Sequence, residues 1–400
     1  MTKVTVLRRA IVAGAMSMTT MAAADSFEPA DAALVEGVAI IPTMTLREQY
    51  DDNVLNAEAD QVDSLVTVLR PAVKVGVGDD ISRLGVQYLL EAARYHQSRE
   101  DDYVDHQLTL GGKHEFTARH RLAAGYTFAH GHEERGTGLS EGQGDAFSSP
   151  IEYDQQRADL TYGFGVRQAV FNIDAKLNYS DLAYTNFSET TRYRDRDAWR
   201  YGLVGYWNLS GRTSLLLDVS QENVRYDTLS AAGNTQDSDV LRAKTGVRWE
   251  ITGKTSGTAR VGWQSKNFDD GQRADFRGFS WDIGAQWSPR SYSTVKLEGG
   301  REARDPDTDG DYIKETTLDL SWRHAWLDRF ATTLGAGYEG RDYTGVDRSD
   351  DLYVLQLAAD YAFSRWARVA FGYELRDQQS SQAAIEYDKD LVYVLLEVGL

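Results

Sequence analysis

The sequence lacks several features that would define common protein classes. It has no cysteine, so no disulfide can stabilise it, and its six prolines and lack of low-complexity linkers favour one folded unit. Beyond the N-terminal region there is no run of about 18 apolar residues, which excludes a conventional spanning helix. The net charge of −18 excludes a general affinity for nucleic acid, because phosphate binding needs a basic surface.

The N-terminus has the pattern of a secretory signal peptide. A basic start and a short apolar stretch, AIVAGAMSMTTMAAA, precede an A-x-A cleavage site that ends at Ala24. We therefore predict a signal peptide over residues 1–24, a short periplasmic segment over 25–37 and one folded domain over 38–400. Because no spanning helix follows, any role in a membrane requires a β-barrel or a peripheral attachment.

From residue 38 onward the sequence repeats one unit, a pair of strands of about ten residues each. Segments such as LTYGFGV, FNIDAKLNY and TTLDLSWRH alternate apolar and polar residues, and no comparable segment shows a helical period. Eight short connections alternate with nine longer, acidic ones, which implies about 18 strands.

These strands and connections predict the fold. They indicate an all-β protein, an antiparallel transmembrane β-barrel of the bacterial outer membrane, with short periplasmic turns and long acidic extracellular loops. The last ten residues, LVYVLLEVGL, carry one wholly apolar face, as a lipid-facing strand requires. Pairing of this strand with the first would leave no free edge. The alternative is a soluble propeller or sandwich, in which connections should not sort so regularly into short and long.

Aromatic residues are expected to mark the two membrane interfaces. The tryptophans beside short turns are Trp207, Trp249, Trp287, Trp326 and Trp366. The tyrosines near long loops are Tyr50, Tyr103, Tyr153, Tyr184, Tyr226 and Tyr343. We therefore predict a periplasmic tryptophan girdle and an extracellular tyrosine girdle.

If the apolar positions face lipid, many basic and fewer acidic residues face the lumen. The basic residues predicted to line the lumen and contact substrate are Arg47, Arg70, Lys74, Arg157, Arg200, Arg242, Lys244, Arg248, Arg260, Arg323, Arg341 and Arg368. A barrel of this size leaves an aqueous channel, and a basic wall favours the passage of anions. The alternative is that these charges pair across strands and only stiffen a polar wall.

One acidic loop, DPDTDGDYIKE, resembles the opening of a calcium-binding loop. Its candidate ligands are Asp305, Asp307, Asp309 and Asp311, although Glu315 comes one position early for the usual bidentate ligand. Ca²⁺ is therefore the one candidate cofactor. The alternative is an acidic hairpin loop that divalent ions bridge loosely to anionic lipopolysaccharide.

Histidine and acidic residues provide no clear catalytic centre. His130 and His132 fall on one side of an extended strand, as a metal pair needs, but no third ligand is evident nearby. Asp105 and His106 are adjacent and point to opposite faces, so they cannot form a base with its orienting carboxylate. We predict no enzymatic activity.

Two stretches carry a family resemblance. The segments PTMTLREQYDDNVL (42–55) and VTVLRPAVKVGV (66–77) resemble the first two strands of the EpsL-like outer-membrane β-barrels, porin-like proteins found with exopolysaccharide biosynthesis loci. The resemblance extends loosely along the whole hairpin array. It implies an outer-membrane component that helps to move or assemble a secreted polysaccharide, with a periplasmic export protein as candidate partner, and it supplies no catalytic residues.

Three functions follow as hypotheses. An export channel would use inward basic side chains to screen an anionic exopolysaccharide, within outer-membrane lipid and lipopolysaccharide. A general diffusion porin needs the same barrel with a constriction loop, for which the Gly- and Ser-rich segment from Glu133 to Glu152 is the candidate. The third hypothesis is a closed barrel that anchors a partner or the lipopolysaccharide layer.

Overall fold

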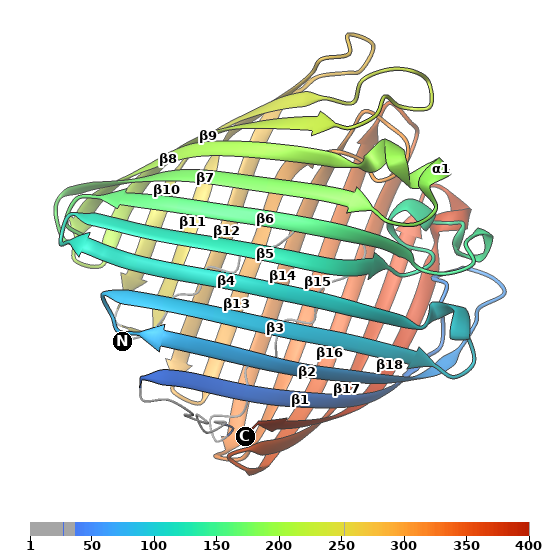
Figure 1. Ribbon diagram of the computed structural model, residues 1–400, viewed down its shortest axis with the longest axis horizontal. Helices are drawn as coiled ribbons and strands as arrows, with labels where there is room; N and C mark the ends of the chain where they lie inside the picture. The colour runs from blue at the N-terminus through green and yellow to red at the C-terminus, as the bar shows by residue number, and fades with distance from the viewer. Residues whose placement is uncertain (1–26, 28–36, 252, 400) are drawn as a thin grey trace.

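A computed structural model describes residues 27, 37–251 and 253–399 of the chain. They form one antiparallel sheet of 18 strands that closes into a barrel, because the first strand pairs with both the second and the last (Figure 1). The predicted fold and strand count are confirmed. No helix in the described part of the chain is long and apolar enough to cross a membrane. The predicted signal peptide lies outside the described residues.

Each strand pairs with its sequence neighbours, and the register of the closing pair runs from Thr43 opposite Gly399 to Asp51 opposite Leu391. The strands are β1 (Val38–Asp51), β2 (Ser64–Gly78), β3 (Ser82–Tyr95), β4 (Tyr103–Thr117), β5 (His120–Glu133), β6 (Ile151–Phe164), β7 (Phe171–Tyr184), β8 (Arg196–Ser210), β9 (Thr213–Tyr226), β10 (Ser238–Ile251), β11 (Thr255–Phe268), β12 (Phe276–Arg290), β13 (Ser293–Arg304), β14 (Tyr312–Leu327), β15 (Phe330–Thr344), β16 (Ser349–Ser364), β17 (Ala367–Ser380) and β18 (Tyr387–Gly399). The strands are longer than predicted and extend beyond the roughly ten residues that are needed to cross a bilayer.

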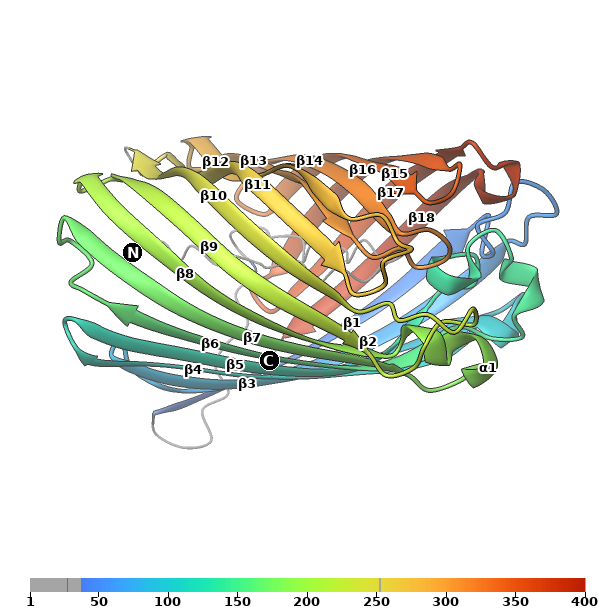
Figure 2. The ribbon, with the colours of Figure 1, turned by 90° about the horizontal axis from the view of Figure 1, so that it is seen from above.

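Short turns gather at one end of the barrel and long loops at the other, as Figures 1 and 2 show. In the turn between β2 and β3 the Asp79 carboxylate accepts the backbone N–H groups of Ile81 and Ser82, both at 2.8 Å. These bonds lower the pKa of Asp79. Gly78 takes a φ of +109°, which other residues rarely adopt. The long loops contain α1 (Ser188–Thr191) and the 3₁₀ turns η1 (Arg99–Asp101), η2 (Gly138–Ser140), η3 (Gly144–Ala146), η4 (Arg192–Arg194) and η5 (Ala383–Ile385).

Side chains alternate between an apolar outer face and a polar inner face. On β18, Val392, Val394 and Leu396 are exposed on the outside, whereas Leu391 and Tyr393 are buried on the inside. The final strand therefore presents its apolar face to lipid, as predicted. Trp207, Trp287, Trp326 and Trp366 are likewise exposed near the short turns, which confirms the tryptophan girdle for these four residues.

An extracellular tyrosine girdle is present, but five of the six tyrosines predicted to form it do not belong to it. Of the six, only Tyr50 is exposed outside, whereas Tyr103, Tyr153, Tyr184, Tyr226 and Tyr343 lie on the inner face and support the loops. The actual outer tyrosine band consists of lipid-facing tyrosines whose hydroxyls bond to polar side chains, namely Tyr50 to Asp63, Tyr88 to His106, Tyr126 to Gln156, Tyr201 to Asn223, Tyr338 to Asp351 and Tyr373 to Asp390. A hydroxyl that reaches a polar partner is typical of tyrosine at a membrane interface.

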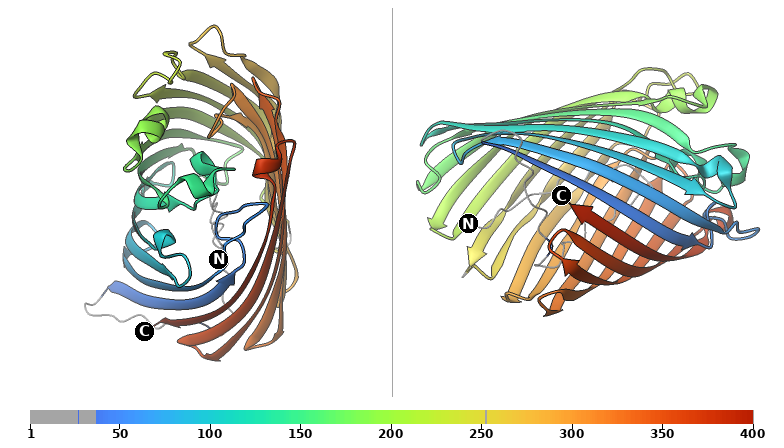
Figure 3. Two further views of the ribbon diagram at one scale, coloured as in Figure 1. Left: turned by 90° about the vertical axis from the view of Figure 1, so that its right-hand side faces the viewer. Right: turned by 60° about the horizontal axis from the view of Figure 1, so that its bottom comes forward.

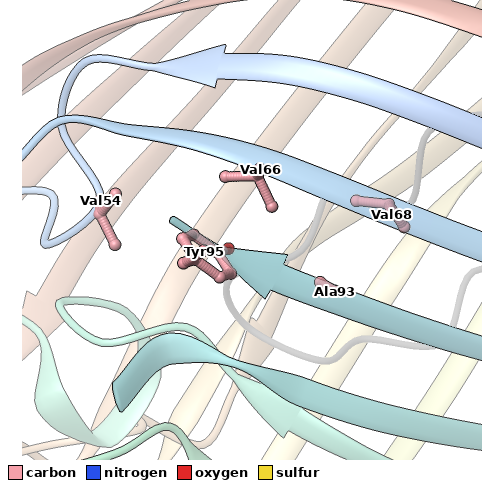
Figure 4. Packing of buried hydrophobic residues seen from close by; sticks show 5 residues of the cluster. All are labelled: Val54, Val66, Val68, Ala93 and Tyr95. Atoms are coloured by element: carbon pink, nitrogen blue, oxygen red, sulfur yellow. The ribbon is translucent and has the colours of Figure 1, made fainter. Parts of the chain in front are cut away.

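Apolar packing inside the barrel is confined to small clusters. The largest joins Val54, from the loop after β1, to Val66, Val68, Ala93 and Tyr95 on the inner face of β2 and β3 (Figure 4). This cluster holds the loop after β1 against the wall inside the end with the long loops.

At the opposite end of the lumen, Phe27 packs on Ala362 and lies 5.4 Å from the Arg368 guanidinium. Phe27 and Gly37 are the two described residues of the predicted periplasmic segment.

Candidate functional site

All twelve basic residues predicted to line the lumen lie on the inner face of their strands. Leu46, Leu69 and Val73, for example, are exposed outside next to Arg47, Arg70 and Lys74. Most of the twelve, however, are engaged by acids of the same wall. The pairs are Arg70 with Glu91, Arg200 and Arg242 with Glu222, Lys244 with Asp282, Arg260 with Asp218 and Asp282, Arg323 with Asp360, Arg341 with Glu339 and Glu141, and Arg368 with Glu397.

These ion pairs neutralise much of the positive charge of the wall. Acidic residues that sequence reasoning missed also occupy inner positions, namely Asp51, Asp105, Glu115, Glu133, Glu222, Glu250, Glu302, Asp350 and Glu397. Glu222, for example, accepts hydrogen bonds at 2.7 to 2.9 Å from Arg200 and Arg242 on the two neighbouring strands. Most of the wall thus consists of cross-strand ion pairs, the alternative considered for these charges.

A local excess of positive charge remains near the short turns. It consists of Lys74 on β2, Arg83 on β3 and Lys113 on β4, which we call the basic patch. Arg83 and Lys113 are directly opposite each other in the β3–β4 register. All three side chains are exposed to the lumen, and within the described ranges none forms an ion pair or side-chain hydrogen bond. Like charges directly opposite each other destabilise a sheet, so the basic patch costs stability in the absence of an anion.

The basic patch borders a small inward pocket of about 170 Å³. Besides Lys113, its charged lining includes Arg121, Arg167, Glu115 and Asp174. Arg167 pairs with Glu115 at 2.6 Å, and Arg121 lies 3.8 Å from Asp174. The pocket therefore extends the basic patch with arginines whose charge is already partly neutralised.

The loop between β5 and β6, residues 134–150, crosses the end of the barrel that carries the long loops (Figure 3, left). At its base, Arg135 pairs with Asp101 at 2.5 Å. Across the opening, Glu141 accepts bonds from Arg341 on β15 at 3.0 Å and from Arg348 in the loop before β16 at 2.5 Å. This segment is the candidate constriction loop of the sequence analysis, and it contacts the far side of the mouth.

Two glycines let the loop 134–150, which we call the mouth loop, pack closely against its neighbours. Gly136 has a φ of +81°, and a Cβ there would lie 1.8 Å from the Leu55 carbonyl oxygen. A Cβ on Gly142 would meet the carbonyl oxygen of Ala384, in the loop before β18, at 3.0 Å. The loop thus packs against the two neighbouring connections β1–β2 and β17–β18.

Arg348 joins this loop to a second one. Its guanidinium donates hydrogen bonds to the carboxylates of Glu141 and Asp350. It also donates to the Thr308 hydroxyl, at 3.3 Å, in the loop between β13 and β14. The guanidinium carbon lies 4.3 Å from the centre of the Tyr343 ring. Burial opposes the charged form of Arg348, but these anionic partners outweigh it and raise its pKa. One network therefore links loops from several sides of the mouth.

The candidate calcium ligands belong to this second loop. Asp305 lies 2.9 Å from Lys266, Asp307 lies 3.1 Å from Arg304, and Asp311 lies 3.8 Å from Arg273, while Asp309 is exposed. In the part of the chain that the structure describes, no three His, Asp or Glu side chains converge on a metal position. The geometry therefore gives the calcium prediction no support.

Asp307 shows how these cations hold the loop. Burial would raise the pKa of the Asp307 carboxyl, but the positive charges of Arg304, Arg196 and Arg341 outweigh this effect and lower the pKa. The charged form of Asp307 is thus favoured in this loop.

Comparison with known proteins assigns the family. Residues 37–399 match the family described as Putative beta-barrel porin 2. The chain belongs to this family. It is a porin-like β-barrel channel of the bacterial outer membrane, so the short turns are periplasmic and the long loops extracellular. The EpsL-like association itself has no counterpart in this match.

Several solved structures of outer-membrane proteins are similar to the chain at low sequence identity. OccK2 (OpdF) of Pseudomonas aeruginosa is 12% identical with a TM-score of 0.48, covering 92% of this chain and 99% of that one. The outer membrane protein opdK of Pseudomonas aeruginosa is 10% identical with a TM-score of 0.47, covering 90% and 98%. OccAB3 of Acinetobacter baumannii is 11% identical with a TM-score of 0.45, covering 90% and 99%. No curated protein sequence matches the chain.

Proposed function

We propose that this channel takes part in the export of an anionic exopolysaccharide, which enters the lumen from the periplasm past the basic patch. The observation that carries the proposal is the cluster of Lys74, Arg83 and Lys113, which form no ion pair among the described residues, in contrast to the paired cations elsewhere on the wall. Asp79 lies in the adjoining turn, and its carboxylate feels the charge of Lys113. Carboxylate or phosphate groups on a polymer would relieve the repulsion between these cations. The position of the basic patch near the periplasmic turns suits a substrate that enters from that side.

Polysaccharide is the substrate class that the resemblance to EpsL-like barrels suggests. The proposal predicts a periplasmic export protein that delivers the polymer to the short turns. Ca²⁺ in the loop 305–311 remains a separate hypothesis, to be tested by titration of the purified protein.

The first test is ion selectivity in a planar bilayer. Under a salt gradient, the wild-type channel should show an anion-selective reversal potential. The double variant Arg83→Gln with Lys113→Gln should lose most of this preference. Arg225→Gln is the matched control, because Arg225 pairs with Asp239 on the outer face and its loss changes the net charge equally per site. A wild-type channel without anion preference would contradict the proposal.

A general diffusion porin is the second candidate, and the mouth loop favours it, because such a porin needs a loop across its opening. Liposome swelling distinguishes the two functions. A diffusion porin should admit small neutral and anionic sugars at rates set by their size alone, whereas the export channel should favour anionic ones.

A further inference from the structure

Four polar side chains form a continuous row on the lipid-facing side of β3 to β6. The Tyr88 hydroxyl lies 2.7 Å from Nδ1 of His106, and Nδ1 of His130 lies 2.8 Å from Oδ1 of Asp154. Between these two pairs, His106 and His130 are directly opposite each other in the β4–β5 register, with ring centroids 6.3 Å apart. Each strand thus contributes one member of the row.

The row lies where the outer tyrosine band borders the apolar surface of the barrel. Val104 and Leu110, which share the outer face of β4 with His106, are exposed to lipid, and Tyr88 belongs to the outer tyrosine band. Polar and ionisable side chains on the lipid face of a barrel are unfavourable to a degree that depends on depth. The row differs from the other tyrosine contacts at this level because it brings two histidines and a carboxylate into register.

We propose that His106 and His130 bind a divalent transition-metal ion, such as Zn²⁺ or Cu²⁺, at the outer membrane interface. Imidazole nitrogen is a preferred ligand of these ions. Because both Nδ1 atoms already have partners, Nε2 of each ring is left to coordinate the metal. With metal–nitrogen bonds of about 2.1 Å, two such rings have centroids roughly 5 to 6 Å apart, so a small rotation of either ring suffices.

The neighbours of the two rings fit this role. A metal-binding histidine usually donates its other ring N–H to a carboxylate or another acceptor, which fixes the ring and its tautomer. The Asp154 carboxylate can accept this N–H from His130, and the Tyr88 hydroxyl can accept it from His106. The protein supplies two ligands, and water or the phosphate oxygens of surrounding lipid would complete the coordination.

The pair differs from the one suggested by the spacing of His130 and His132. His132 bonds to Asp105 at 2.9 Å and stacks on Tyr103 with centroids 3.8 Å apart, so its ring is engaged elsewhere. The partner of His130 comes instead from the neighbouring strand. This metal site is independent of any substrate in the lumen.

The test uses the purified full-length barrel in detergent, with Cu²⁺ for electron paramagnetic resonance and Zn²⁺ for calorimetric titration. The copper spectrum of the wild type should show two coordinated imidazole nitrogens. His106→Ala and His130→Ala should each lower Zn²⁺ affinity at least tenfold, and Asp154→Asn should lower it about tenfold.

His120→Ala is the matched control. His120 also lies on the outer face, with Nδ1 2.5 Å from the Tyr162 hydroxyl, but it pairs across the strands with Phe164 rather than with another histidine. The control should bind Zn²⁺ as the wild type does. A wild-type copper spectrum with one imidazole or none, or an equal loss of affinity in His120→Ala, would overturn the proposal. The spectrum needs no variant, so it stands even if a substitution impairs folding.

Discussion

Replacing Glu141 by glutamine should open the extracellular mouth. Glu141 connects the loop 134–150 to the opposite wall through Arg341 and Arg348, and all three side chains are at most 11% exposed. Glutamine keeps the shape and one acceptor oxygen but removes the charge. Loss of a hydrogen bond to a charged group costs about 1.5–3 kcal/mol, and disruption of a buried ion pair about 3–5 kcal/mol.

Because glutamine retains one acceptor, we take about 2–3 kcal/mol as the weakening of the closed state. Since about 1.4 kcal/mol corresponds to a tenfold change in an equilibrium constant, the ratio of open to closed channels should rise roughly 30- to 150-fold. Single-channel recording measures this ratio directly, as the time spent in each conductance level.

Asp145→Asn provides the control. Asp145 lies in the same loop and loses the same charge, but it is exposed and, among the described residues, forms no ion pair. The fraction of time that the Asp145→Asn channel is open should match that of the wild type. Unchanged gating in Glu141→Gln, or an equal effect of Asp145→Asn, would refute the assignment of Glu141 as the contact that closes the mouth.

Three further predictions concern charge and stability. Asp307 is half-buried, and the surrounding arginines keep its pKa below that of an unfolded aspartate, about 3.9. Its contribution to stability is therefore present above that pH and lost as the pH falls through the lower folded value. Conductance should rise only below about pH 4, and Asp307→Asn should abolish this transition. Arg83→Gln should stabilise the barrel by about 0.2–1 kcal/mol in urea unfolding, because it relieves repulsion from Lys113, and a loss of stability would contradict the basic patch. Arg323→Gln should instead lower the free energy of unfolding of the barrel by about 3–5 kcal/mol, because Asp360 is 1% exposed and would lose its partner. A neutral effect would show that this ion pair does not stabilise the wall.

Local patterns in the sequence predict much of this fold. The alternation of apolar and polar residues identifies each strand and assigns Arg47 or Arg323 to the inner face, since the period of a strand is two. The same rule, applied to every strand, could have placed Tyr103 inside, because it shares the parity of Asp105 and Gln107. Proximity to a long loop was the wrong criterion for a girdle residue.

Long-range contacts were not predictable in this way. Glu141 and Arg348 are 207 positions apart, and no periodicity reveals that their loops meet across the mouth. Alternation also assigns a face without giving the register between strands. The opposition of Arg83 to Lys113, and of His106 to His130, therefore became apparent only from the paired strands.

The most direct measurement for the proposed export function is block of oriented single channels by oligosaccharides added to one side at a time. Uronic-acid oligosaccharides on the periplasmic side should block the current at lower concentration than neutral ones of equal length. The triple variant of Lys74, Arg83 and Lys113 to glutamine should remove this difference. Equal block by neutral and acidic sugars in the wild type, or a preference that survives in the triple variant, would contradict the role of the basic patch in recognising an anionic polymer.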